Sequence, residues 1–277
     1  MPILNYGSEV WGFHEGKDVD KVYHDFCKYV AGLPTNAPNL AARGEFGRKR
    51  LIFYRYNRVI KYWSKLLNNN CNKVLRAAYL EQLRLDAAGS DVWVSDVRTL
   101  LCMMGFSQIW SEQCIPNHKT FFSEFKSRLS CLEENLFDLQ KHQFPRLFLF
   151  SQLKSLNISH HWSSDACFHL KALFSKCICS SHNLAIETGR RLKTPRNLRL
   201  CILCNGNVIE DEFHFLLICP LYNNIRHRYI PEHYRTEPSW NKVVSMLINP
   251  NYNKQVMYYL RSAFQIREKA IEAILYP

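Results

Sequence analysis

Three cysteines and one histidine in the C-terminal third constrain the fold of this chain more than any other feature. Two residues separate Cys201 from Cys204, nine separate Cys204 from His214, and four separate His214 from Cys219. Three thiolates and one imidazole make a complete tetrahedral ligand set for a Zn²⁺ ion. The Cys-x2-Cys pair lets a tight turn direct both sulfurs to one point. We therefore expect one structural zinc ion, with no coordination position left open for catalysis.

The alternative is that these four residues are ordinary buried thiols and a core histidine, but their spacing favours the metal. The remaining cysteines are mostly isolated, as core thiols tend to be; they are Cys27, Cys71, Cys102, Cys114, Cys131, Cys167, Cys177 and Cys179. Cys177, Cys179 and His182 form a second cluster. Its spacing is cramped for one metal, so we expect burial there instead.

Two acidic residues precede the histidine of the first cluster. Glu210 or Asp211, about one helical turn before His214, is expected to accept the second imidazole N–H and fix the ligand tautomer. The equal alternative is that these acids only favour the start of a short helix near Ile209, where they suit the helix dipole. Pro220 predicts the end of that helix at Cys219.

Positive charge is concentrated in two segments of a chain with a net charge of +12. Residues 41–70 hold eight Lys/Arg against Glu45 alone, and residues 151–200 hold eight against Asp165 and Glu187. Such segments indicate RNA and/or DNA as partner, with weak sequence specificity, although a solvated surface is the alternative. The candidate nucleic-acid-binding residues are Arg190, Arg191, Lys193, Arg196 and Arg199 beside the zinc ligands, and Arg55, Arg58, Lys61 and Lys65 in the first segment.

Apolar residues recur at helical spacing through most of the chain, which predicts a mainly α fold with a small C-terminal zinc-binding module of the CCHC type. In residues 48–67, Ile52, Tyr56, Val59, Trp63 and Leu66 form an apolar stripe, and the basic residues lie on another face. Further helices are expected at 18–33, 71–86, 119–141, 144–157, 164–177, 239–248 and 253–275. Residues 182–200 are polar, basic and punctuated by Gly189 and Pro195, which is typical of a linker.

Several classes of function lack their sequence signals. The chain has no adjacent pair of aspartates for two-metal nucleotidyl transfer, no Gly-rich loop ending in Gly-Lys-Ser/Thr, and no Gly-x-Ser-x-Gly turn. We expect no catalysis by this chain alone and no small-molecule substrate. Eleven cysteines without an N-terminal signal peptide favour a reducing compartment, the nucleus and/or the cytoplasm. No apolar run approaches the ~20 residues that span a bilayer, so no membrane partner is expected.

A family resemblance joins these features. The segments PILNYGSEVWG (2–12), FCKYVAGLPTNAPN (26–39), RVIKYWSKLL (58–67), GFSQIW (105–110), HNLAIETGR (182–190) and PRNLRLCILCNGNVIEDEFHFLLICPLYNNIR (195–226) occur in this order. Together they resemble the C-terminal region of LINE-type non-LTR retrotransposon reverse transcriptases, close to jockey-like elements. The abrupt apolar start is what a fragment lacking the fingers and palm would have.

The resemblance implies roles and a domain order. Cys201, Cys204, His214 and Cys219 correspond to the zinc ligands of that family, and the implied role is handling RNA or target DNA during reverse transcription. The expected order is a thumb-like connector with a basic helix (1–67), a helical region (68–180), the zinc-binding module (181–235) and closing helices (236–277). The competing hypothesis is a protein-interaction scaffold in which zinc only stabilises the fold. A cysteine-dependent enzyme is a third, which would need a reactive thiol outside the zinc set.

Overall fold

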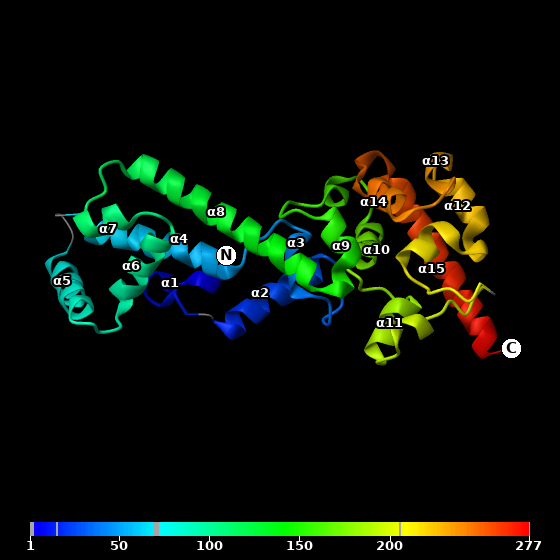
Figure 1. Cartoon of the computed structure of the whole chain (residues 1–277), viewed down its shortest axis with the longest axis horizontal. Helices are drawn as coiled ribbons and strands as arrows, with labels where there is room; N and C mark the ends of the chain where they lie inside the picture. Colours follow the sequence, from blue (N-terminus) through cyan, green and yellow to red (C-terminus); the bar gives the residue numbers. More distant parts are fainter. Residues whose placement is uncertain (1–2, 15, 69–71, 205, 277) are drawn as a thin grey trace. The chain divides into compact units, whose positions relative to one another are not determined.

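The computed structural model describes residues 3–14, 16–68, 72–204 and 206–276. Their regular secondary structure is helical, apart from two isolated antiparallel bridges, Phe46–Ile158 and Leu200–Ile209 (Figure 1). The predicted mainly α fold, with a Cys/His cluster near the C-terminus, is confirmed. None of the described helices is both long and apolar enough to cross a membrane.

The chain divides into two compact units that do not follow the four consecutive segments expected from the sequence. Unit 1 contains Met1–Tyr23 and Lys49–Leu136, and unit 2 contains His24–Arg48 and Phe137–Pro277. Two long helices, α2 (Lys17–Val30) and α8 (His118–Gln143), contribute residues to both units. The apolar pattern of a continuous helix does not change at a boundary that lies inside the helix. The sequence therefore gives no sign that α2 and α8 are each shared between the two units.

Unit 1 surrounds a core rich in aromatic residues. Besides parts of α2 and α8 it contains η1 (Ile3–Asn5), α1 (Ser8–Trp11), α4 (Leu51–Leu66), α5 (Lys73–Ala87), α6 (Trp93–Met103) and α7 (Ser107–Glu112). Trp63 is fully buried, and its indole N–H donates to the Tyr79 hydroxyl at 2.9 Å. From α8, Phe121, Phe125 and Leu129 reach the same core at four-residue spacing. The apolar stripe predicted for α4 is the face that packs there.

Unit 2 carries the cysteine cluster. Besides parts of α2 and α8, its elements are α3 (Asn39–Gly44), η2 (Pro145–Leu147), α9 (Phe148–Leu153), η3 (His160–Ser163), α10 (Phe168–Ile178), α11 (Ala185–Arg191), η4 (Arg196–Leu198), η5 (His214–Ile218), η6 (Pro220–Tyr222), α12 (Asn223–Tyr229), α13 (Glu232–Arg235), α14 (Trp240–Ile248), η7 (Pro250–Tyr252) and α15 (Asn253–Leu275). Helix α15 packs against α10, α12 and α14, and buries Val256, Met257 and Leu260 among them.

Two local predictions were wrong. The first half of the expected linker at 182–200 forms helix α11, because Leu184, Ile186 and Glu187 are buried and anchor it. Four of the cysteines expected in the core are instead exposed, and these are Cys102, Cys114, Cys131 and Cys167. Isolation in the sequence does not distinguish a thiol on the wet face of a helix from one on its buried face. Cys71 lies outside the described residues.

Candidate metal centre

Cys201, Cys204, His214 and Cys219 converge in unit 2. One ligand atom from each residue lies within 4.8 Å of all the others. The His214 Nε2 atom is 3.5 Å from the Cys204 sulfur. Tetrahedral ligands at a Zn–S distance of about 2.3 Å are about 3.8 Å apart, so a contraction of about 1 Å or less closes the set on one ion. Among the described residues no other group of metal-ligating side chains converges in this way.

The first two cysteines lie on a short turn held by backbone hydrogen bonds. The Cys201 N–H donates to the Val208 carbonyl at 2.8 Å, and the Glu210 N–H donates to the Arg199 carbonyl at 3.0 Å. Asn207 closes the turn with a left-handed φ of 47°, a conformation that asparagine tolerates better than most residues. These bonds direct the sulfurs of Cys201 and Cys204 towards the same side of the loop.

The other two ligands lie at either end of a π-helical turn, His214–Ile218. The Cys219 N–H donates to the His214 carbonyl at 2.8 Å, a bond between residues five apart. An ordinary α-helix would bond residues four apart, and isolated π turns occur frequently at functional sites. Pro220 follows directly and begins η6, so the helix ends at Cys219 as predicted.

Buried polar side chains fix this π turn from outside. The Arg226 guanidinium is 4% exposed and donates to the carbonyls of Leu216 and Cys219, at 2.9 and 2.7 Å. The Tyr259 hydroxyl donates to the Phe215 carbonyl at 2.6 Å. Carbonyls at the end of a helical segment lack partners within it, so these side chains satisfy groups that would otherwise be buried unpaired. No pattern in the sequence distinguishes Arg226 from the exposed basic residues beside it.

The expected hydrogen bond from the His214 ring N–H to Glu210 or Asp211 is absent among the described residues. The Asp211 carboxylate accepts from the His214 backbone N–H at 2.9 Å. Glu210 is buried and accepts two bonds from Arg267 in α15, at 2.7 and 2.8 Å, and one from the Ala185 N–H. The His214 Nδ1 atom is buried and has no hydrogen-bond partner among the residues that the structure describes. The acids therefore serve the helix start and the docking of the ligand loop on α11 and α15.

The thiols are close enough to share a proton. A hydrogen bond from the Cys219 thiol to the Cys201 sulfur holds the pKa of Cys201 well below its ordinary value. The same bond, together with burial, raises the pKa of Cys219. The shift at Cys201 favours the thiolate, the form in which cysteine binds a metal. The donor set, its burial and its spacing fit one metal ion such as zinc.

The second cysteine cluster is buried, as predicted. Cys177, Cys179 and His182 are at most 5% exposed. The His182 Nε2–H donates to the Glu212 carboxylate at 2.9 Å, and His182 Nδ1 accepts from the Leu184 N–H at 3.4 Å. Both ring nitrogens are therefore occupied within the fold. Burial raises the pKa of Cys177 and of Cys179, which makes both thiols poor nucleophiles.

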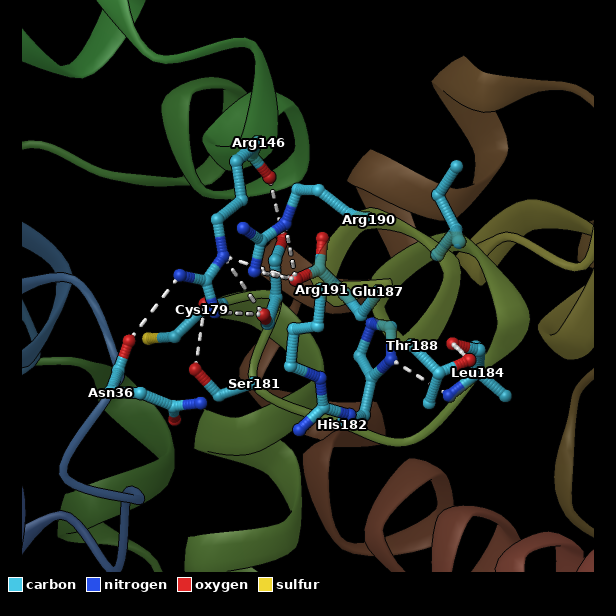
Figure 2. A network of polar contacts seen from close by, with 12 residues as sticks. Asn36, Arg146, Cys179, Ser181, His182, Leu184, Glu187, Thr188, Arg190 and Arg191 are labelled. Carbon is cyan, nitrogen blue, oxygen red and sulfur yellow. Dashed lines mark hydrogen bonds and ion pairs between the residues drawn. The ribbon is translucent and has the colours of Figure 1, made fainter. Parts of the chain in front are cut away.

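The five basic residues beside the metal ligands do not form one surface. Arg190 joins Arg146 in ion pairs with the buried Glu187 carboxylate, at 2.8 and 3.1 Å (Figure 2). Arg199 donates to the carbonyls of Thr194 and Ile186 and is half-buried. Arg190 and Arg199 are therefore both engaged in contacts within the fold. The prediction that these two arginines bind nucleic acid loses its basis.

The other three basic residues of this group are exposed. Arg191, Lys193 and Arg196 form no ion pair among the described residues. The only hydrogen bond that Arg191 forms there joins its guanidinium to the Asn183 side chain at 3.2 Å. In Figure 2 the Arg191 side chain points away from Glu187. These three cations, which shortly precede the Cys/His cluster in the sequence, are therefore exposed and outside the ion pairs that the described residues form.

On helix α4 of unit 1 the predicted basic stripe is also incomplete. Arg55 is fully buried, ion-paired to Asp20 at 3.1 Å and bonded to Asn5 at 3.2 Å, so placing it on a nucleic-acid surface was wrong. Arg58 is ion-paired to Glu9 at 2.9 Å. Lys61 and Lys65 are exposed. A helical wheel of α4 alone cannot reveal that η1 and α1 pack against the face of α4 that carries Arg55.

Comparison of the chain with protein-family models, with curated proteins and with solved structures finds no match.

Proposed function

We propose that this chain is a palm-less C-terminal segment of a LINE-type reverse transcriptase that binds RNA or DNA through a zinc-stabilised module and does not catalyse by itself. The observation that carries the proposal is that Arg191, Lys193 and Arg196, which shortly precede the Cys/His cluster in the sequence, are exposed and without ion pairs among the described residues. Cations held near a rigid centre contact phosphates with little loss of conformational entropy on binding.

Zinc is the metal that fits this role. Three sulfurs and one nitrogen are typical of closed structural zinc sites, whereas calcium and magnesium prefer oxygen ligands. Native mass spectrometry of the purified chain is expected to show one zinc ion, lost in Cys204→Ser and retained in Cys102→Ser, whose thiol is exposed and outside the cluster. An unchanged zinc content in Cys204→Ser would refute the assignment.

The nucleic-acid role predicts a defined dependence on salt. Each phosphate contact on a single strand contributes roughly −0.7 to the slope of log affinity against log salt. Replacing Arg191, Lys193 and Arg196 by Gln is expected to flatten the slope by about two units if all three bind. The matched control replaces Arg228, Arg261 and Lys269, which are also exposed residues of unit 2, and removes the same charge.

Filter binding of single-stranded RNA at several salt concentrations measures this slope. Absence of binding at low salt, or equal slopes for the two triple variants, would overturn the proposal.

A specific observation favours protein docking as the second candidate. Leu192, Leu198 and Ile202 are 78%, 60% and 64% exposed near the same cations. Aliphatic side chains do not stack on bases as aromatic rings do, but they are common at protein interfaces. Replacing the three by Ser would leave RNA affinity unchanged and abolish partner binding if this candidate is correct.

A further inference from the structure

Unit 2 contains a cavity to which none of the four residues of the Cys/His cluster contributes, and of the three exposed cations only Arg191 lines it. It has a volume of about 560 Å³ and lies between the loop after α2, the ends of α10 and α11, and helix α15. Pockets for small ligands and cofactors commonly have volumes between roughly 300 and 1,000 Å³. The cavity is therefore large enough for one nucleotide-sized ligand.

The inner surface of the cavity is apolar. Leu33 from the loop after α2, Leu173 from α10, and Phe264 and Ile271 from α15 contribute to it. The Phe264 ring also packs on Phe215 of the π turn, with ring centroids 4.8 Å apart. This contact connects one side of the cavity to the segment that holds His214 and Cys219. An aromatic ring in an apolar recess is a stacking surface for a nucleobase.

Charges of opposite sign line the cavity from different elements. Lys176 from α10 and Arg191 from α11 supply positive charge, and Glu268 and Glu272 from α15 supply negative charge. None of these four forms an ion pair with another described residue. Arg267 also lines the cavity, but its guanidinium is paired with Glu210. Four unpaired charges around an apolar recess suit a ligand that has both an anionic group and hydrogen-bond donors.

We infer that this cavity binds a nucleotide, the terminal unit of a strand held by the module. Lys176 and Arg191 contact its phosphate, since ammonium and guanidinium groups both bind phosphate oxygens. Phe264 and the leucines contact the base. Glu268 and Glu272 accept hydrogen bonds from sugar hydroxyls and base amino groups, as carboxylates do in dinucleotide and base recognition. The choice of occupant rests on the proposed function, which this inference deepens.

Isothermal titration calorimetry with nucleoside monophosphates tests the cavity without any polymer. We expect saturable binding at one site per chain, about tenfold weaker for the corresponding nucleosides and for inorganic phosphate alone. Lys176→Ala is expected to weaken the binding by about tenfold, whereas Lys269→Ala, which removes an exposed lysine of α15 outside the cavity, leaves it unchanged. Leu173→Glu introduces a charge into the apolar surface and is expected to abolish binding.

Failure of this inference is distinguishable from failure of the proposed function. Absence of saturable binding for all nucleoside monophosphates, or equal binding by wild type and Lys176→Ala, would overturn the cavity assignment even if RNA binding remains salt-dependent. The cavity assignment would be supported if Lys176→Ala loses nucleotide binding while replacement of Lys193 and Arg196 by Gln retains it. This outcome does not depend on the salt dependence measured for RNA.

Discussion

Replacement of Glu45 by Gln tests the most completely buried charge of unit 2. Glu45 is 0% exposed and lies 3.1 Å from the Lys154 ammonium and 3.1 Å from His161 Nε2. Ser159 and Trp162 donate to its two carboxylate oxygens, at 3.0 and 3.2 Å. The carboxylate is thus the common acceptor for donors from η3, from the loop between α9 and η3, and from Ser175 of α10.

The magnitude follows from what the variant leaves behind. Glutamine has one acceptor oxygen in place of two and no charge, so Lys154, only 8% exposed, keeps a buried ammonium without a counter-ion. Removing one partner of a buried ion pair costs about 3–5 kcal/mol, and a whole domain is stable by only about 5–15 kcal/mol. We expect Glu45→Gln to lose about 3–5 kcal/mol in the free energy of unfolding.

The pH dependence has a defined sign. Burial alone would raise the pKa of Glu45, but the Lys154 charge and the hydrogen bonds from His161 and Ser175 lower it well below its ordinary value. A carboxylate whose folded pKa is depressed stabilises the fold above its unfolded pKa of about 4.3, and this contribution is lost as the pH falls. The stability difference between wild type and Glu45→Gln should therefore shrink as the pH drops below about 4.

Urea denaturation followed by circular dichroism measures the stability, and hydrogen exchange by mass spectrometry assigns the loss to residues around 41–48 and 157–178. Glu237→Gln, at an exposed position of unit 2, is the control and should change stability by less than about 0.5 kcal/mol. Adding Lys154→Met to Glu45→Gln should recover part of the loss, because both charges are then gone. A loss below about 1 kcal/mol for Glu45→Gln alone would refute the reasoning.

Three further predictions concern the metal centre and the two cores. Arg226→Gln should weaken metal binding about 10- to 100-fold in a chelator competition, because the carbonyls of the π turn lose their donor. Arg228 is exposed, so Arg228→Gln is the control and should leave the metal affinity unchanged. Equal affinities for the two variants would contradict the role of Arg226. Trp63→Ala should cost about 3–5 kcal/mol and remove exchange protection from α4, and retained protection there would count against it. Iodoacetamide should label the four exposed cysteines before it labels Cys177 and Cys179, because burial raises the pKa of these two thiols. Early labelling of Cys179, detected by mass spectrometry, would argue against that burial.

The sequence determined the helices and the ligand set. Periodic apolar residues placed α4, α8, α14 and α15 within a few residues of their observed ends, because one side of each helix must face a core whatever its neighbours are. The four residues of the Cys/His cluster were predicted to converge because a Cys-x2-Cys pair in a tight turn, followed by His and Cys near a proline, is a local pattern. Local patterns need no knowledge of the distant chain.

Only the tertiary structure decided which charged residues remain free. Arg55 and Arg190 look like surface cations in sequence, yet one is buried against Asp20 and the other is paired with the buried Glu187. Likewise Glu45, the one acid in a basic segment, is the centre of a buried network with residues more than a hundred positions away. Ion pairs between distant segments depend on which helices become neighbours. Packing decides that, and the charge pattern of a single helix does not contain it.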